Sequence, residues 1–580
     1  MLSAIKKLYK EGIFSDLDIH FAKLMAELSD NSDEILLGGA LVSYYNNQGS
    51  SCVNLHLLAG KPFPPESDTS TILCPQLLHW ETSLINCNVV GSPGDCTPLI
   101  LNNHRLYSYR YFNYEFTLAA RIHSLININD INYQILSKGL ERLFSKQPSK
   151  QKEAAYLAVS HNFCIISGGP GTGKTATVIK ILALLLEQSS NLNLVMVAPT
   201  GKAANRLKEA ITKKLPSLDC DSTIKAAIPT EAYTIHRLLG SKLNSPYFHF
   251  SANNPLPYDV IVVDEASMID LALMTKLMQA VPDNARLILL GDKDQLASVE
   301  AGTVLGDICA ASLIQSSVID NSQLTVSNSK LNDINSSIIL LDKSYRFSEQ
   351  SGIWKLAQAV KQGDGETALQ VLKSTEYPDV EWHSTESSSD LIKYISTNFS
   401  ILESEPEIAL QQFDKFRVLC ATRHGSYGIL NINQSIENYY RQSGQIKAHR
   451  YHGQPIIIKR NDYHLNLFNG DIGIIFNIAG QQKAIFQDAT GQLREFWPNR
   501  LPEYETVYAM TIHKSQGSEF EKVLMILPEH FSPVLTRQLI YTGITRAGKT
   551  ISIWGNEQIF TQAITTEVNR SSGLTELCVM

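Results

Sequence analysis

Short apolar runs alternate with longer amphipathic segments through the middle of the chain. The runs are FCIIS, LVMVAP, DVIVVD and RLILLG, and helix-like text separates them. This alternation predicts a parallel sheet built from βαβ units. Each run ends in a polar motif, and open α/β sheets bind ligands at the carboxyl ends of their strands. We therefore expect a ligand site at that edge of the sheet.

The same pattern starts again near residue 339 with IILLDKSYRF. It resumes with FRVLCATR at 416–423 and finishes with KVLMILP and ISIWG. Between these parts, at 446–502, the text changes to short strands and turns such as GQPIIIKRND and NGDIGIIF. That change predicts a small β-barrel inserted into a second α/β block. A Ser/Asn-rich stretch at 312–337 is expected to be a mobile surface loop.

The first 145 residues have a different character. Two helix-like patterns, LDIHFAKLMAEL and EILLGGALVSYY, precede a loop-rich stretch with several prolines, and no catalytic pattern is present. Acidic side chains outnumber basic ones, which argues against a nucleic-acid-binding arm. The expected fold class is α/β, with four parts: a mainly helical, partner-docking domain at 1–145, two parallel-sheet motor domains at 146–338 and at 339–445 with 503–580, and the inserted barrel at 446–502.

Composition narrows the class of protein. A chain of 580 residues is too long for one hydrophobic core. No apolar run approaches the roughly 20 residues of a membrane span, and the N-terminus lacks a signal core, so we expect a cytoplasmic protein. Nine scattered cysteines without a CxxC pair make a zinc or iron-sulfur site improbable. A net charge of -7 means that any nucleic acid must be held by a local track.

A glycine-rich turn follows the first apolar run. The text FCIISGGPGTGKTATVIKILALLL gives a strand, a turn and a helix in the order of a phosphate-binding loop. Glycines allow backbone amides to surround a triphosphate at a helix N-terminus. Lys174 would neutralise the β and γ phosphates, and Thr175 would bind Mg²⁺. The sequence therefore predicts that ATP and Mg²⁺ bind at Gly168, Gly169, Pro170, Gly171, Thr172, Gly173, Lys174 and Thr175.

Two further strand ends carry acidic and amide side chains. Asp264 and Glu265 follow the run YDVIVV, so both carboxylates are expected to point toward the phosphates. Asp264 would hold Mg²⁺ through water, and Glu265 would be the general base that deprotonates the attacking water. The next strand delivers Asp292 and Gln295, and Gln295 would report the state of the γ-phosphate. With Lys174, these side chains predict an ATP-hydrolysing site.

Five more motifs follow in a fixed order. They are APTGKAANRL at 198–207, TIHRLLG at 234–240, LLDKSYRF at 340–347, YAMTIHKSQGSEF at 508–520 and YTGITRA at 541–547. Together with the loop and the Asp-Glu strand, this ordered set resembles the superfamily 1 DNA helicases over about residues 146–580. The resemblance implies two RecA-like domains that close on ATP and reopen after hydrolysis, and so step along DNA.

The resemblance also implies roles for residues that pattern alone does not explain. Arg346 and Arg546 would reach into the ATP cleft as arginine fingers and stabilise charge on the transferring phosphoryl group. Tyr345 would stack on adenine, and Gln151 would contact its edge. Core packing for Tyr345 and solvent exposure for Gln151 are the alternatives.

A DNA track is implied in the same way. Hydroxyl and amide groups in these motifs can contact phosphates without reading sequence, which suits a translocating motor. A purely structural role is the alternative for the histidines, and no nearby ligand pattern favours a metal. The residues are Thr200, Lys202, Thr234, His236, Thr511, His513 and Ser515.

More narrowly, the chain resembles the RecD-like family. The resemblance rests on the N-terminal texts together with GGPGTGKT, VDEASMID and FNGDIGI. It implies 5′ to 3′ movement on single-stranded DNA, RecB-like and RecC-like partners in an exodeoxyribonuclease V complex, and a role in double-strand break repair and recombination. A stand-alone helicase and a regulatory subunit that uses ATP only as a switch are the alternatives. Because no nuclease motif is visible, DNA cutting would belong to a partner.

Overall fold

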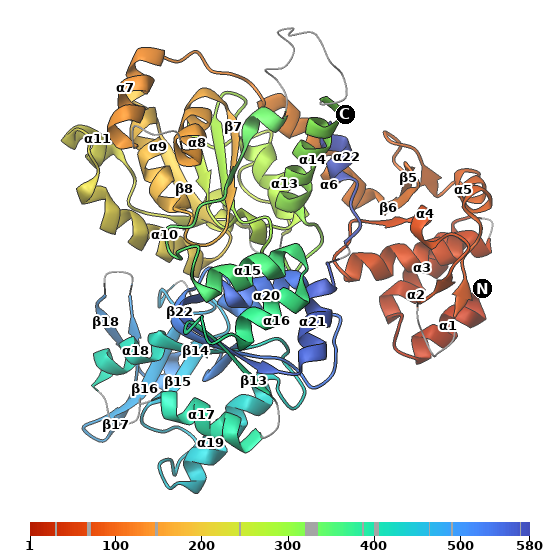
Figure 1. Ribbon diagram of the computed structural model, residues 1–580. Coiled ribbons are helices and arrows are strands. Elements are labelled where there is room, and N and C mark those ends of the chain that lie inside the picture. The colour runs from red at the N-terminus through yellow and green to blue at the C-terminus, as the bar shows by residue number, and fades with distance from the viewer. Residues whose placement is uncertain are drawn as a thin grey trace.

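The computed structural model describes residues 1–29, 32–65, 71–144, 149–242, 245–319, 334–384, 388–399, 405–462, 464–488, 491–568 and 570–579. Figure 1 shows two α/β bodies stacked on each other, with the N-terminal part to one side of them. In the described part of the chain, no helix combines the length and the apolar character needed to cross a membrane.

The N-terminal unit is a small α/β domain. Its helices are α1 (Leu2–Lys10), α2 (Asp16–Glu27), α3 (Asp33–Asn47), α4 (Leu55–Leu58) and α5 (Leu77–Ile85). A sheet of order β1-β6-β5-β4 is formed by β1 (Cys52–Asn54), β4 (Val90–Gly91), β5 (Leu99–Asn102) and β6 (Arg105–Ser108). A separate pair joins β2 (Pro62–Phe63) and β3 (Ile72–Leu73). Ser15 and Asp18 form a capping box that fixes the start of α2.

The first motor sheet is parallel and has the order β12-β7-β11-β10-β8-β9. Its strands are β7 (Phe163–Gly168), β8 (Leu194–Ala198), β9 (Tyr233–Thr234), β10 (Val260–Val263), β11 (Arg286–Gly291) and β12 (Ile338–Leu341). Every residue of β7 and β10 is buried, which explains why these strands read as continuous apolar runs. Separate apolar clusters cover the two faces of the sheet.

Helices surround this sheet. They are α6 (Tyr109–Leu125), α7 (Tyr133–Leu143), α8 (Lys150–Ser160), α9 (Lys174–Gln188), α10 (Gly201–Lys214), α11 (Ser222–Ala227), α12 (Ile235–Leu239), α13 (Leu271–Ala280) and α14 (Val304–Ile319). Short 3-10 turns lie at Leu215–Ser217, Ala266–Met268 and Ile334–Ser337.

The second motor sheet is also parallel, with the order β13-β22-β21-β14-β20. Its strands are β13 (Val380–Ser384), β14 (Phe416–Cys420), β20 (Ala509–Thr511), β21 (Phe520–Ile526) and β22 (Ala547–Gly555). The surrounding helices are α15 (Gly352–Gln362), α16 (Gly365–Lys373), α17 (Ser388–Asn398), α18 (Pro406–Lys415), α19 (Ile429–Gln442), α20 (Arg537–Ile544) and α21 (Glu557–Thr565), with a 3-10 turn at His513–Ser515. The predicted α/β architecture with two parallel sheets is therefore confirmed.

The insertion is antiparallel and has the order β18-β17-β16-β15-β19. Its strands are β15 (Gln454–Ile458), β16 (Ile472–Ile478), β17 (Gln481–Gln487), β18 (Leu493–Phe496) and β19 (Tyr504–Thr506), with a 3-10 turn at Pro498–Arg500. No pairing closes β18 on β19 among the described residues, so the strands are seen as a sheet and closure into a barrel is not confirmed. Since β19 pairs with β15, the insertion reaches residue 506 and not 502.

Three other expected boundaries are wrong. Strand β12 pairs with β7 in the first sheet, so the second motor domain does not begin at residue 339. Helices α6 and α7 contribute side chains to the core clusters of the first motor domain, so the N-terminal domain ends well before residue 145. The last helix, α22 (Leu574–Val579), lies against α6 and α14 and not in the second motor domain (Figure 1). Apolar periodicity reports burial, but not which sheet provides the buried face.

The loop expected at 312–337 is mostly not described. Residues 312–319 continue α14, which corrects the predicted start of the loop, and residues 334–337 form a 3-10 turn. Residues 320–333 lie outside the described residues.

Residues 570–579, here called the C-terminal strap, join the N-terminal domain to the first motor domain. The Ser51 amide donates to the Ser571 carbonyl at 3.0 Å, and Arg105 forms an ion pair with Glu576 at 2.7 Å. On the motor side, the Thr575 hydroxyl donates to the Asp307 carbonyl at 3.1 Å. The strap is thus held from both sides.

A buried carboxylate lies beneath the strap. Glu115 on α6 is fully buried and accepts hydrogen bonds from the Ser572 hydroxyl at 2.9 Å and from the Gly573 amide at 3.1 Å. Burial raises the pKa of Glu115 to about 7, with a further contribution from Asp307, while these hydrogen bonds oppose the shift. The strap and the Ser51 hydroxyl of the N-terminal domain, which also donates to Glu115, therefore supply donors to this buried acid.

Candidate nucleotide site and DNA track

The phosphate-binding loop joins β7 to α9. Gly171 and Gly173 have φ angles of 78° and 82°, in the left-handed region that favours glycine. At Gly168, a side chain would meet the Leu341 Cβ at 2.8 Å. The Lys174 ammonium is expected to bind phosphates. In this structure it donates instead to the carbonyls of Gly168 and Gly169 in the loop itself. The loop geometry matches the prediction made from the glycine spacing.

The acidic pair stands at the end of β10, facing the loop. Burial raises the pKa of Asp264 to about 6, and the neighbouring Glu265 adds to the shift while Lys174 opposes it. The Glu265 amide donates to Asp264 Oδ1 at 2.9 Å. Glu265 itself has a φ of 53°, a left-handed conformation that costs a non-glycine residue roughly 1–3 kcal/mol. Such strain at a carboxylate that faces a cavity is typical of a functional position.

The same cavity can accept a divalent cation. Thr175 and Asp264 both line it, so a hydroxyl and a carboxylate are available at its wall. Mg²⁺ prefers oxygen ligands and usually keeps several waters, with one or two protein ligands and substrate phosphates completing its shell. The raised pKa of the buried Asp264 fits this chemistry, because a cation would relieve the cost of ionising a carboxylate in that place.

Gln295 lies where the two motor domains meet. Its Nε2 donates to Asp292 Oδ2 at 2.9 Å, and the Tyr541 hydroxyl from the second domain donates to the same oxygen at 3.2 Å. Both Asp292 and Gln295 are buried, and Gln295 lines the nucleotide cavity. An amide that faces the cavity on one side and a cross-domain hydrogen bond on the other is suited to sensing the phosphates.

Both predicted arginine fingers reach this cavity. Arg346 follows β12 and forms an ion pair with Glu519, while its buried Nη1 has no hydrogen-bond partner. Arg546 is buried, and its Nε and Nη1 donate to the Thr542 and Ser518 carbonyls at 3.2 and 3.1 Å. The cavity has a volume of about 840 Å³. Two arginines from outside the first sheet thus meet the phosphate-binding loop and the acidic pair.

The two adenine-side candidates also surround the loop. The Tyr345 amide donates to the Gly171 carbonyl at 2.8 Å, and its ring is 60% exposed, which excludes core packing. Gln151 Nε2 donates to the Thr172 carbonyl at 2.8 Å, so this side chain is not simply solvated. Both side chains line the cavity. Both residues therefore bind backbone carbonyls of the loop.

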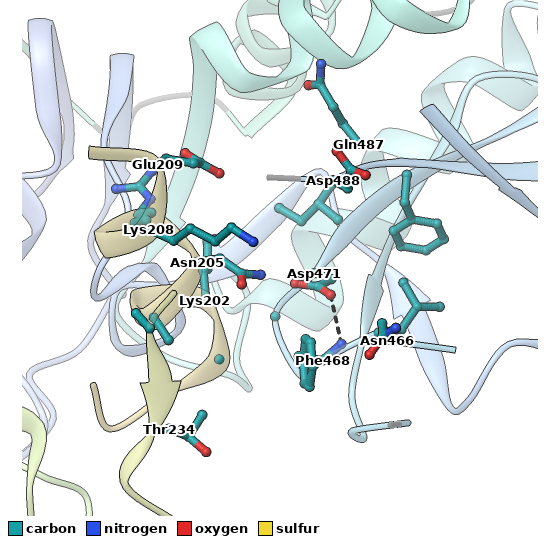
Figure 2. Close-up of a pocket in the computed structure, with 18 of the residues that line it drawn as sticks. Lys202, Asn205, Lys208, Glu209, Thr234, Asn466, Phe468, Asp471, Gln487 and Asp488 are labelled. Atoms are coloured by element: carbon teal, nitrogen blue, oxygen red, sulfur yellow. Dashed lines mark hydrogen bonds between the residues drawn. The ribbon is translucent and has the colours of Figure 1, made fainter. Parts of the chain in front are cut away.

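Two of the predicted DNA contacts line a second cavity, of about 660 Å³. It lies between α10 and the inserted sheet, and Figure 2 shows Lys202 and Thr234 facing Phe468 and Asp471 across it. Burial lowers the pKa of Lys202 to about 7. Lys202 makes no hydrogen bond or ion pair with the described residues, so its amine is available to a ligand in the cavity.

The other predicted contacts have mixed outcomes. Thr200 is the N-cap of α10 and accepts a hydrogen bond from the Ala203 amide, and Thr511 accepts one from the Lys514 amide. Burial lowers the pKa of His236 and of His513, and neither histidine lines the second cavity.

The structure does not support the predicted DNA contact of Ser515. Its side chain is fully buried, and its hydroxyl donates to the Ile512 carbonyl at 2.7 Å. The hydroxyl therefore cannot contact a strand in this conformation. The motif predicts the turn at this position but not the direction of the side chain.

Sequence reasoning missed residues that complete both cavities. Glu519, the partner of Arg346, lies within the predicted SQGSEF text but carried no prediction. Phe468 and Asp471 belong to the text FNGDIG, which contributes to the family resemblance and to the predicted insertion but predicts no contact for either residue. The Phe468 ring packs so closely on Gly201 that a Cβ there would lie 3.1 Å from it. An aromatic residue beside Asn, Gly and Asp in a turn was the available signal.

Together, a phosphate-binding loop after β7, an acidic pair at the end of β10 of the same sheet, and arginines from the inter-domain connection and from the second α/β body define a two-domain P-loop motor ATPase of the helicase class. Three family models match the chain. They describe the RecBCD enzyme subunit RecD N-terminal domain at 10–107, an AAA domain at 151–301 and a UvrD-like helicase C-terminal domain at 506–553.

Whole-chain comparison gives the particular family. The RecBCD enzyme subunit RecD of Haemophilus influenzae is 33% identical, over 100% of this chain and 99% of the relative. The chain belongs to the RecD family of RecBCD enzyme subunits.

Two more distant proteins also match. The ATP-dependent RecD2 DNA helicase of Deinococcus radiodurans is 28% identical over 76% of this chain, but over only 54% of its own length. A solved structure of Pif1 helicases on forked double-stranded DNA matches 71% of this chain and 94% of that chain, at 16% identity and a TM-score of 0.39. At that score the likeness adds nothing to the family assignment.

Proposed function

We propose that this ATP-dependent DNA helicase moves 5′ to 3′ along single-stranded DNA as the RecD-type subunit of a RecBCD complex, with RecB-like and RecC-like partners. The cavity that joins Lys174, Asp264 and Glu265 to Arg346 and Arg546 is the observation that carries the proposal. A site assembled from two bodies is completed only when they close, which links hydrolysis to movement.

In the proposed mechanism, each group acts at a stated atom. The Lys174 ammonium leaves the loop carbonyls for the β and γ phosphates, and Glu265 orients and deprotonates the attacking water. Arg546 stabilises the transferring phosphoryl group, and Arg346 joins it after leaving Glu519. Mg²⁺, held at Thr175 and Asp264, would neutralise charge on the phosphate oxygens. Tyr345 stacks on the base while Gln151 contacts its edge.

The RecD-type subunit is favoured over a stand-alone helicase by similarity. The chain is 33% identical to the Haemophilus RecD and matches the RecD N-terminal domain model at 10–107, whereas it is 28% identical to the Deinococcus helicase. An ATP switch without productive hydrolysis is disfavoured because Glu265, Arg346 and Arg546 are all present and line the cavity. DNA cutting is assigned to a partner.

Duplex substrates with one single-stranded tail test both direction and partnership. With ATP, we expect unwinding of a 5′-tailed duplex and not of a 3′-tailed one, because only the former loads a 5′ to 3′ motor on the correct side of the junction. We also expect two large chains to copurify stoichiometrically from the native cell. Preference for a 3′ tail would contradict the direction, and full unwinding by a chain that has no partners would support the stand-alone alternative.

The DNA track is proposed to run through the cavity at Lys202, with Thr200, Thr234, His236, Thr511 and His513 along the same path. Phe468 faces this cavity from the inserted sheet and offers a stacking surface for a base. Asp471, whose carboxylate accepts from the Phe468 amide at 2.8 Å, holds the turn in place (Figure 2). A lysine and an aromatic ring on opposite walls suit a backbone phosphate and its base.

Lys202→Ala should weaken binding of an oligothymidylate about tenfold and reduce the salt slope of the affinity by about one, because one phosphate contact is lost. The pH dependence gives a sharper test. The pKa of Lys202 is about 7 without DNA, and a bound phosphate would raise it, so DNA binding takes up a proton. Affinity should therefore fall as pH rises above 7 in the wild type.

Fluorescence anisotropy from pH 6 to 9, at several salt concentrations, measures both effects. Lys373→Ala is the matched control, because that lysine is ion-paired with Glu557 on α21, away from the cavity. The variant at Lys202 should lose the pH dependence, and the control should keep it. An unchanged pH profile in Lys202→Ala would remove Lys202 from the track.

A further inference from the structure

A short loop at 295–302 connects the nucleotide cavity to the strap. It begins with Gln295, at the cavity, and its next residue is bound by the second motor domain. The Leu296 amide donates to the Thr542 hydroxyl at 2.9 Å, and Gln516 Nε2 donates to the Leu296 carbonyl at 2.9 Å. The first half of the loop is therefore fixed to the domain that carries Arg546.

The second half of the loop is bound by the Arg570 side chain of the strap, and its Ala301 carbonyl also accepts from the Leu271 amide at 3.1 Å. Arg570 Nη1 donates to the Ser298 carbonyl at 2.7 Å and to the Glu300 carbonyl at 3.1 Å. The Ser298 hydroxyl donates to the Glu300 and Gly302 carbonyls, so the turn is closed on itself around this cation. Arg570 makes no ion pair among the described residues, and its hydrogen bonds go to backbone carbonyls. The hydrogen bonds of Arg570 therefore stabilise the conformation of the loop.

The N-terminal domain reaches the same point. The Gly302 amide donates to the Gly49 carbonyl at 3.0 Å. Gly49 has a φ of 87°, and a Cβ there would lie 2.6 Å from the Arg570 Cζ. Glycine at this position leaves room for the guanidinium.

The predicted DNA contact His513 also lies near Arg570. Burial lowers the pKa of His513, and the charge of Arg570 lowers it further, which places the guanidinium within electrostatic range of this histidine. Gln516, which binds the loop through Leu296, lies in the same segment as His513. One cation thus borders the N-terminal domain, the 295–302 loop and the segment that carries His513.

We propose that Arg570 is a positioning residue that couples DNA binding to ATP hydrolysis by holding the 295–302 loop between Gln295 and His513. The inference rests on the proposed helicase function. When DNA occupies the track, the His513 segment shifts the loop through Gln516, and Gln295 moves with it at the phosphates. Coupling of this kind is reciprocal for binding, so nucleotide also changes the affinity for DNA. Arg570 contacts neither ligand, and it acts through the loop.

The test compares ATPase activity with and without an oligothymidylate in the full chain. Arg570→Ala should leave the basal kcat within about twofold, while stimulation by DNA falls about tenfold, because charge-assisted hydrogen bonds to the loop are lost. Arg570→Lys should restore part of the stimulation, since an ammonium can donate to the same carbonyls. Arg105→Ala is the matched control, because it removes the ion pair of the strap with Glu576 and does not touch the loop.

Several outcomes would overturn the proposal. One is full stimulation in Arg570→Ala, and another is an equal loss of basal and stimulated activity, which a merely structural role predicts. If Arg570→Ala does not fold, Gly49→Ala decides, because its added methyl displaces the guanidinium without removing it and should give the same selective loss. Normal stimulation in Gly49→Ala would then overturn the inference. A wild-type ATPase that DNA does not stimulate refutes the proposed function, whereas stimulation that persists without Arg570 refutes only this inference.

Discussion

Lys174→Gln is expected to abolish DNA-stimulated ATP hydrolysis, with a fall in kcat/KM of at least about 10²–10³-fold, because a preorganised cation that meets the β and γ phosphates is lost. Folding should be intact. Lys174 is at the start of α9, and among the described residues its ammonium donates to the Gly168 and Gly169 carbonyls alone, which a glutamine amide can still reach in part. Nucleotide affinity should fall together with turnover.

The measurement is steady-state ATPase with saturating oligothymidylate, accompanied by thermal unfolding. Lys180→Gln is the matched control on the same helix, since the Lys180 ammonium lies over the Phe144 ring at 4.4 Å and away from the loop. That control should keep its activity. Hydrolysis that survives in Lys174→Gln would refute the assignment of the nucleotide site.

Glu265→Gln is expected to separate binding from chemistry. A glutamine keeps the shape of the side chain but cannot accept the proton of the attacking water, so kcat should fall about 10²–10⁴-fold. Nucleotide binding should be nearly unchanged, because Lys174 and the loop amides remain. DNA binding in the presence of ATP should persist, since the motor would be held before hydrolysis.

Single-turnover hydrolysis and equilibrium nucleotide binding distinguish this variant from Lys174→Gln. Asp283→Asn is the control, an exposed carboxylate of the same domain that pairs with Arg121 on α6. Equal losses of binding and of turnover in Glu265→Gln would mean that Glu265 positions the nucleotide and is not the base.

Much of the nucleotide site could be predicted from sequence because its residues are local. Gly171 and Gly173 need particular backbone angles, and Lys174 must begin a helix, so spacing alone fixes their arrangement. The apolar run before Asp264 predicts a buried strand, and a strand end fixes where the next carboxylate lies. The arrangement of a local site of this kind is determined by consecutive residues.

Contacts between distant segments could not be predicted in the same way. The sequence around Arg346 does not indicate that its guanidinium pairs with Glu519. The sequence around Arg570 does not indicate that its hydrogen-bond acceptors are the carbonyls of residues 298 and 300. The direction of Ser515 depends on a turn that its own sequence does not determine. Which of the two sheets β12 joins depends on packing between distant segments, and that packing is determined only in three dimensions.

The place of β12 in the first sheet has a mechanical consequence. The connection from the first to the second motor domain leaves this strand at Leu341 and passes directly over the phosphate-binding loop, where the Tyr345 amide bonds the Gly171 carbonyl. The segment that connects the two motor domains is thus also part of the wall of the nucleotide cavity. Any movement of the second domain displaces this connecting segment, which touches the phosphate-binding loop. The domains therefore cannot move without disturbing the nucleotide-binding site.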